Sequence, residues 1–106
     1  MSKFSIAGPL LDACVLGVLS VKPTYGYDLT QTIQQQTDLS ESTLYPVLRR
    51  LLKNQLLETF DQEVDGRNRR YYKITPAGVS VLERYRQEWG LYQMRICRLL
   101  SGGMAS

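Results

Sequence analysis

The sequence predicts a mainly α-helical chain with three short helices, a small two-stranded β-hairpin and one long C-terminal helix, in that order. Apolar residues at helical spacing in the first half predict the short helices. A turn signal at Asp65 and Gly66, between two segments of strand-like composition, predicts the hairpin. A heptad pattern near the C-terminus predicts the long helix. With 106 residues, of which 43% are hydrophobic, the chain has the size of one domain with a packed core.

The first predicted helix follows Pro9, a residue that suits the first helical turn. The segment from Leu10 to Val21 is apolar nearly all round, so we expect it to be buried on more than one side. Lys22 and Pro23 are expected to end it, because proline disfavours helical geometry in the residue before it. The segment carries Asp12 and is about half as long as a membrane span. No signal peptide is apparent, so we expect a cytoplasmic protein without a membrane partner.

The second helix is predicted from Thr24, as its N-cap, to about Gln36. Tyr25, Leu29 and Ile33 are spaced four residues apart and so share one face. This face is expected to pack against the first helix.

The third helix is predicted from Ser40, as its N-cap, to about Lys53. Its expected buried stripe consists of Leu44, Leu48, Leu51 and Leu52. The opposite face presents polar and cationic side chains at helical spacing: Ser42, Tyr45, Pro46, Arg49 and Lys53. Two interpretations of Pro46 are open, because proline removes a helical hydrogen bond. The helix either runs through Pro46 or begins there.

After the third helix the pattern of apolar residues changes from helical to strand-like spacing. We expect the two strands of the hairpin over Leu57–Glu63 and Arg70–Ile74. Its tip is rich in arginine and consists of Arg67, Asn68, Arg69 and Arg70. A solvated strand edge rarely places three arginines within four residues beside a turn, so the tip favours a polyanionic partner.

The last helix is predicted to be the longest, with Thr75 as N-cap and Pro76 in its first turn. Residues at alternating spacings of four and three form a heptad seam that begins at Gly78. We expect a homodimer whose interface consists of Leu82, Tyr85, Trp89, Tyr92, Ile96 and Leu99. Arg84 and Glu88 are spaced to form an ion pair.

The chain lacks the residues that several kinds of catalytic and metal-binding site require. It contains no histidine and only two cysteines, Cys14 and Cys97, each within an apolar run and expected to be a buried, reduced thiol. There is no disulfide framework, no metal-ligand spacing, no glycine-rich phosphate loop and no pair of carboxylates at catalytic spacing. We therefore expect no metal, no cofactor and no enzymatic activity.

Three helices followed by a hairpin is the order of a winged helix-turn-helix DNA-binding domain, in which the third helix enters the major groove. Seven of the thirteen lysines and arginines lie between Arg49 and Lys73. Side chains of this kind contact phosphates and base edges, so we expect Ser42, Tyr45, Arg49, Lys53 and the hairpin tip to bind double-stranded DNA. A homodimer predicts a pseudo-palindromic operator. A helical interaction adaptor without DNA binding is the alternative, although it leaves the basic tip unexplained.

The order of elements also predicts the division of the chain. Residues 1–75 would form the DNA-binding domain, and residues 76–100 a dimerisation helix within the same compact unit. Residues 101–106 are expected to be a disordered tail.

Four segments, in this order and spacing, resemble the PadR family of bacterial transcriptional regulators: residues 16–19, 25–29, 42–51 and 69–78. The resemblance covers the chain from about Leu10 to Leu100, and it implies a winged helix dimer that usually represses its own or a neighbouring promoter. It also implies that Tyr25 and Tyr27 lie near the DNA backbone. Ser42, Thr43, Tyr45 and Arg49 match recognition-helix positions, and Arg67, Arg69 and Arg70 match the wing. Where the family usually has glycine after the recognition helix, this chain has Asn54, Gln55 and Leu56, and Asn54 is expected to take the left-handed cap position.

Small members of this family include drug-responsive regulators in which a tryptophan from each subunit brackets a flat aromatic ligand at the dimer centre. Trp89 falls at the matching place, with Asp12 and Ala13 expected to line the same cavity and Gln93 one turn beyond. This resemblance implies a small aromatic or cationic effector. The other interpretation, that Trp89 only packs the dimer, is equally compatible with the sequence.

Overall fold

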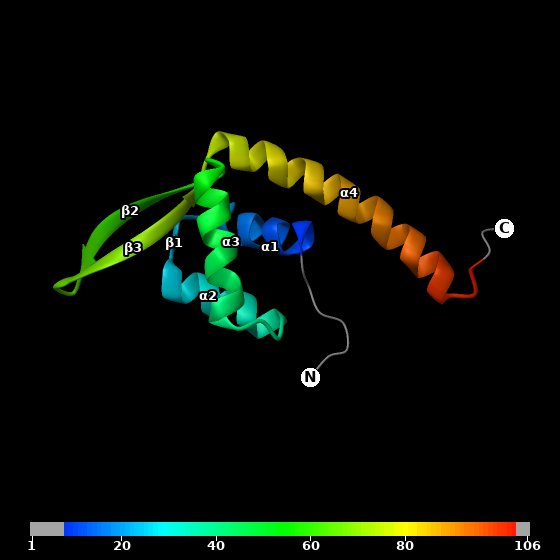
Figure 1. Ribbon diagram of the computed structural model, residues 1–106, viewed down its shortest axis with the longest axis horizontal. Coiled ribbons are helices and arrows are strands. Elements are labelled where there is room, and N and C mark those ends of the chain that lie inside the picture. Colours follow the sequence, from blue (N-terminus) through cyan, green and yellow to red (C-terminus); the bar gives the residue numbers. More distant parts are fainter. Residues whose placement is uncertain (1–7, 104–106) are drawn as a thin grey trace.

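The computed structural model describes residues 8–103, and its elements follow the predicted order (Figure 1). The predicted mainly α fold class is confirmed, with four helices and a small antiparallel sheet. The elements are α1 Pro9–Leu19, β1 Thr24–Tyr25, α2 Gly26–Gln36, α3 Glu41–Lys53, β2 Leu57–Val64, β3 Arg67–Ile74 and α4 Pro76–Leu100. The hairpin of β2 and β3, here called the wing, and the distal half of α4 project from opposite sides of the helical body.

Helix α1 forms the centre of the core and contacts α2, α3 and α4. Its residues Leu11, Val15, Leu16 and Leu19 are all buried, as expected for a helix that is apolar on most sides. Each such side chain contributes about 2 kcal/mol when it leaves water. The helix ends at Leu19, before the predicted Lys22, so Pro23 does not itself terminate it.

The prediction that Thr24 is the N-cap of the second helix is wrong. Thr24 and Tyr25 form the short strand β1, which pairs with Tyr72 and Tyr71 of β3, and α2 begins at Gly26. The sheet therefore has three strands in the order β1-β3-β2. Backbone pairing with β3 supplies the hydrogen bonds that a helical turn would otherwise have given these residues.

Helix α3 runs continuously through Pro46, so the interpretation in which it begins at Pro46 is wrong. Its buried stripe contains Leu44, Leu48 and Leu51 as expected, together with Val47, whereas the predicted Leu52 is only half-buried. The helix is amphipathic, and its buried side packs into the core, where it contacts α1.

The C-terminus of α3 is closed by Gln55, which has a φ of 61°, whereas Asn54 has an ordinary φ of −84°. The prediction that Asn54 takes the left-handed position is therefore wrong by one residue. The Gln55 amide donates to Leu52 O at 3.0 Å and the Leu56 amide to Leu51 O at 2.9 Å. This pair of hydrogen bonds is the Schellman motif, which satisfies carbonyls that the helix leaves free.

The end of α3, the base of the wing and the start of α4 meet at one junction. The Thr75 hydroxyl donates to Gln55 O at 2.7 Å, and the Thr75 amide donates to Leu56 O at 3.1 Å. The same hydroxyl accepts a bond of 3.0 Å from the Gly78 amide, which confirms Thr75 as the N-cap of α4. A Cβ atom on Gly78 would lie 2.2 Å from Leu56 O, so only glycine permits this approach.

The wing is a regular antiparallel pair in which residues 57–64 oppose residues 74–67. Its turn is the predicted Asp65 and Gly66, with φ of 52° and 76°. Two positive φ values identify a type I′ turn, for which Asp-Gly is favoured. The strands extend closer to the turn than predicted, so Arg67, Asn68 and Arg69 belong to β3 itself.

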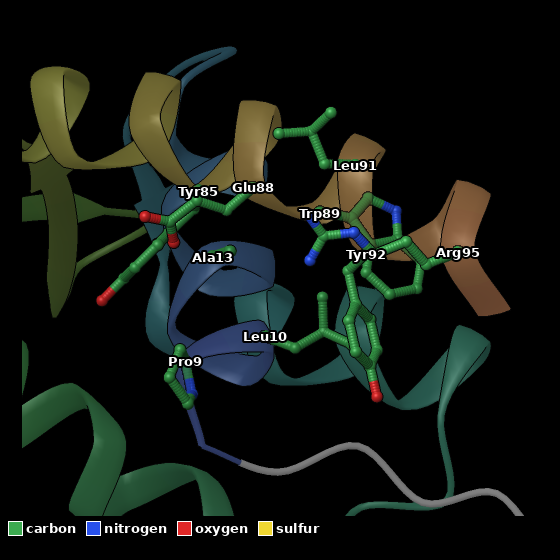
Figure 2. Close-up of a pocket in the computed structure, with 9 residues that line it drawn as sticks. All are labelled: Pro9, Leu10, Ala13, Tyr85, Glu88, Trp89, Leu91, Tyr92 and Arg95. Atoms are coloured by element: carbon green, nitrogen blue, oxygen red, sulfur yellow. The ribbon is translucent and has the colours of Figure 1, made fainter.

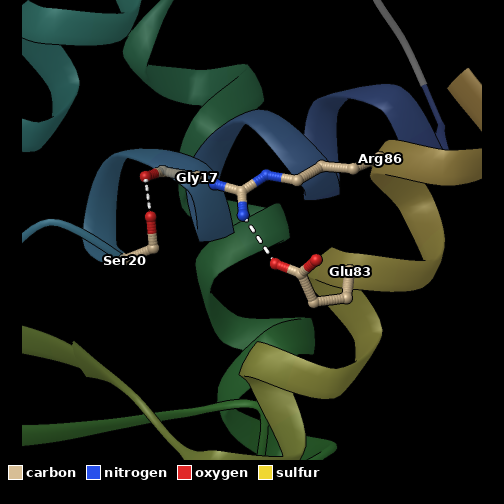
Figure 3. A network of polar contacts seen from close by, with 4 residues as sticks. All are labelled: Gly17, Ser20, Glu83 and Arg86. Atoms are coloured by element: carbon tan, nitrogen blue, oxygen red, sulfur yellow. Dashed lines mark hydrogen bonds and ion pairs between the residues drawn. The ribbon is translucent and has the colours of Figure 1, made fainter. Parts of the chain in front are cut away.

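Helix α4 has 25 residues, and its proximal part packs on α1. The ion pair on this part joins Glu83 and Arg86 at 2.6 Å, near the C-terminal end of α1 (Figure 3), in place of the predicted Arg84–Glu88 pair. Cys97 is exposed, so the expectation that it is buried in the chain is wrong. Ser101, Gly102 and Gly103, part of the predicted disordered tail, form a turn that ends α4, and residues 104–106 lie outside the described residues.

Replacing Gly78 with Ala is expected to destabilise the protein by about 3 kcal/mol or more, because the added methyl group meets a backbone carbonyl that cannot move without disrupting the junction. The free energy of unfolding from urea titration measures the loss. The matched control is Gly17→Ala in α1, where an added Cβ meets no atom within 4 Å and alanine favours the helix by about 1 kcal/mol. Equal stability of the Gly78→Ala variant and the wild type would contradict the packing described for the junction.

Candidate nucleic-acid interface

The exposed face of α3 carries the side chains that the sequence assigned to DNA. The other side of the helix is buried at Leu44, Val47, Leu48 and Leu51. The side chains that are all exposed are Ser42, Thr43, Tyr45, Arg49 and Lys53. Pro46 lies on the same exposed face and has no amide hydrogen to donate to the Ser42 carbonyl. The arrangement leaves a polar and cationic ridge that a groove of the duplex can accept.

Hydroxyl groups gather at the N-terminus of this helix. Ser40 Oγ lies 2.8 Å from Ser42 Oγ and 3.1 Å from Thr43 Oγ1. Ser40 is the N-cap residue as predicted, but its side chain makes no cap bond to a backbone amide. The three hydroxyls are instead held next to the positive end of the helix dipole, where an anion is favoured.

Aromatic side chains surround the start of α2. Tyr27 and Tyr45 are exposed, and Tyr25 is half-buried beside the wing. Tyr72, which the sequence analysis did not single out, projects from β3 into a hollow between the wing, α2 and α3, lined also by Tyr27, Tyr45 and Arg70. Burial raises the pKa of the Tyr72 hydroxyl, with Arg70 acting in the opposite direction and Tyr45 in the same direction. The alternation of strand residues, with Tyr71 on one face and Tyr72 on the other, was the signal that could have revealed it.

The predicted cluster Arg67, Asn68, Arg69 and Arg70 is not one patch. Arg69 lies over the ring of Tyr25, with Cζ 4.9 Å from the ring centroid. Arg70 lies on the other face of the wing, where its Nε is 3.4 Å from Asp61 Oδ1. Successive residues of a strand point to opposite faces, which is the reason for this division.

The distal half of α4 exposes large apolar side chains. Trp89, Tyr92 and Leu99 are 43%, 56% and 67% exposed, and Leu91, Met94 and Leu100 are exposed with them. Leu82 is only 2% exposed and Tyr85 packs against the same core. The prediction that Leu82 lies between subunits is therefore wrong, because this residue is already buried within its own chain. Ile96 is half-buried.

A hollow of about 390 Å³ lies between the start of α1 and the middle of α4 (Figure 2). Of the four residues predicted to bind a ligand, Ala13 and Trp89 line it, together with Leu10, Tyr92 and Glu88. Asp12 does not line it, because this side chain faces α3 and pairs with Arg50. Gln93 is exposed and is not part of the lining either. The hollow is thus mainly aromatic and aliphatic, with one carboxylate and one guanidinium, Arg95, at its edge.

A helix-turn-helix with a polar, cationic third helix and an arginine-bearing wing defines a winged helix protein of the DNA-binding class. Residues 15–84 match the model of the transcriptional regulator PadR-like family. The chain belongs to this family, whose members bind DNA and typically form dimers.

Solved structures show the same architecture. The chain is similar to smu.1704 from Streptococcus mutans UA159, with a TM-score of 0.89 and 35% identity over 99% of each chain. It is also similar to the PadR-like transcriptional regulator BC4206 from Bacillus cereus, with a TM-score of 0.79 and 33% identity over 85% of this chain and 90% of that one. The transcriptional regulator Rv3488 from Mycobacterium tuberculosis is 42% identical over 64 residues, which cover 59% of this chain and 60% of that protein.

Two further observations concern membranes and metals. Among residues 8–103, none of the helices is both long and apolar enough to cross a membrane. The same part of the chain brings together no group of three or more metal-ligating side chains of the His, Cys, Asp or Glu type.

Proposed function

We propose that this chain is a cytoplasmic regulator that binds a pseudo-palindromic operator, with α3 in the major groove and the wing on the adjacent backbone. The observation that carries the proposal is the exposed face of α3, where polar and cationic side chains lie opposite the buried residues of the same helix. The exposed residues are Ser42, Tyr45, Arg49 and Lys53, and the buried ones are Leu44, Val47, Leu48 and Leu51. Hydroxyls and a guanidinium can read base edges, and the cations can neutralise phosphates.

We further propose that the functional unit is a homodimer assembled through the distal half of α4. Trp89, Tyr92, Ile96 and Leu99 recur at heptad spacing on a segment that projects beyond the helical body. A contiguous apolar face of this kind is typical of an interaction surface. Pairing of two such helices would place the two recognition helices on one side of the assembly, as two half-sites require.

The regulatory outcome we favour is repression of the chain's own or a neighbouring promoter, relieved by a small aromatic or cationic molecule. The hollow between α1 and α4 supports this proposal, because Trp89 and Tyr92 offer ring faces and Glu88 offers a carboxylate to a cation. A ligand that prefers one angle between the α4 helices would shift the spacing of the two recognition helices.

Selection from a pool of random duplexes is expected to enrich a two-fold symmetric sequence, which the protein then shifts on a gel in the presence of competitor DNA. Arg49→Ala and Lys53→Ala should each reduce the dependence of log affinity on log salt by about 0.9 for every phosphate that the variant no longer neutralises. The matched control is Arg84→Ala, an exposed arginine of α4. Binding of the selected sequence no tighter than competitor DNA would contradict the proposal and favour an adaptor.

Light scattering at micromolar concentration is expected to give twice the mass of the chain. Leu99→Glu should yield a monomer, because it places a charge in the proposed apolar interface. Arg84→Glu, on the proximal part of the helix, should leave the dimer intact. A monomeric wild type would contradict the assembly through α4.

Planar cationic dyes are expected to quench the fluorescence of Trp89, the single tryptophan of the chain. Glu88→Gln should weaken binding of cationic dyes more than of neutral ones, since it removes the carboxylate from the hollow. Asp12→Asn is the control, because this side chain faces α3 instead. Fluorescence that stays unchanged at saturating dye would contradict an effector site at Trp89.

A further inference from the structure

The two faces of the wing carry different charge. The outer face is defined here by the residues that share a side with Tyr25: Val64, Gln62, Phe60 and Glu58 of β2 and Arg67, Arg69, Tyr71 and Lys73 of β3. The inner face carries Asp61 and Glu63 of β2 opposite Arg70 and Asn68 of β3. Towards the tip, the outer face therefore has two cations and no acid, whereas the inner face has two acids and one cation.

Cross-strand partners reinforce this difference. Arg67 lies opposite Val64 and Arg69 opposite Gln62, so neither guanidinium faces a carboxylate across the strands. Arg70 lies opposite Asp61 and pairs with it. Within residues 8–103, neither Arg67 nor Arg69 forms an ion pair. Lys73, at the base of the same face, lies opposite Glu58. The two outer arginines are thus the cations near the tip of the wing that neither pair with nor lie opposite a carboxylate.

Arg69 is held in place by a row of aromatic rings. Its guanidinium lies over Tyr25, whose ring centroid is 6.0 Å from that of Tyr71, and Tyr71 stacks on Phe60 at 5.4 Å with an interplanar angle of 9°. Strand pairing of Tyr25 with Tyr71 fixes the first of these rings on the wing. A guanidinium that stacks on a ring keeps its N–H groups free at its edge, where they can bind a phosphate.

We propose that the outer face of the wing is its phosphate-binding face, with Arg67 and Arg69 as the contacts, and that Tyr25 is a positioning residue that acts through Arg69. Arg70 lies on the inner face of the wing, where it pairs with Asp61. This assignment rests on the proposed DNA-binding function and specifies which part of the wing serves it. The contribution of Tyr25 comes from its ring and not from its hydroxyl.

The test is fluorescence anisotropy with a labelled mixed-sequence DNA duplex, long enough for two half-sites, over a series of KCl concentrations. Arg69→Gln and Arg70→Gln form a matched pair, since they remove the same charge from adjacent positions. Arg69→Gln should weaken binding roughly tenfold per engaged wing at about 0.1 M salt and reduce the salt slope by about 0.9 per wing. Arg70→Gln should change both quantities by less than half as much.

Tyr25 is tested by two variants that differ in the ring. Tyr25→Leu, which removes the ring, should weaken binding by about two- to fivefold, the fold-change equivalent to an exposed cation–π contact. Tyr25→Phe should bind as the wild type does. Tyr25→Leu should cause no further loss in a chain that already carries Arg69→Gln, because the two residues act as one unit. Thermal melts confirm that each variant is folded, and Tyr25→Phe preserves the packing in any case.

Three results would overturn the assignment while leaving DNA binding intact. These are a larger effect of Arg70→Gln than of Arg69→Gln, equal losses from Tyr25→Phe and Tyr25→Leu, or additive losses from Tyr25→Leu and Arg69→Gln. A wild-type protein that binds no duplex at the lowest salt would overturn the proposed function together with this assignment. The two kinds of failure are therefore distinguishable in the same titration.

Discussion

The fold depends on one close contact between backbones, where Gly78 of α4 meets Leu56 at the end of α3. Because a Cβ at this position would lie 2.2 Å from a carbonyl oxygen, the approach fixes how closely α4 can follow the base of the wing. Thr75 adds two hydrogen bonds to residues 55 and 56. The left-handed Gln55 turns the chain so that these bonds can form. Helix α3, the wing and α4 thereby share a single anchoring point.

Two further connections tie α3 and the wing to the rest of the body. Strand β1 joins the start of α2 to β3 through Tyr25 and Tyr71, and the Asp12–Arg50 ion pair joins α1 to α3. The Arg50 side chain is 48% exposed and the Asp12 side chain 13% exposed, so water partly screens this pair and it orients the two helices more than it stabilises them. Within the described part of the chain, the distal half of α4 has no comparable hydrogen bonds or ion pairs to other elements. Its exposed tryptophan, tyrosine and leucines form the surface on which we propose that a partner subunit packs.

Local signals were sufficient for most of the fold. Helical spacing in the third and last helices, the Thr75 and Pro76 start signal and the Asp65–Gly66 turn each act within a few residues, and these were confirmed. Contacts between distant residues were not predictable in this way. Strand β1 forms because Tyr25 pairs with Tyr71 of β3. Asp12 does not line the α1–α4 hollow, because its side chain faces α3 and pairs with Arg50. The arginines of the predicted tip lie on two faces because Arg67–Ile74 is a strand, in which successive side chains alternate. The predicted strand began only at Arg70, so this alternation did not reach Arg67 and Arg69. Gln55 replaced Asn54 at the cap because the helix did not end early.

We propose that α3 and the wing act together as one DNA-reading unit, which a dimer presents twice. Hydroxyl-radical footprinting of the selected operator is the decisive measurement, because it maps the protected sugars along both strands. We expect two protected segments about one helical turn apart. Each should have a flanking patch that disappears in the Arg67→Gln/Arg69→Gln variant, while the central protection remains. A single unpaired footprint, or a flanking patch that persists in that variant, would contradict the proposal.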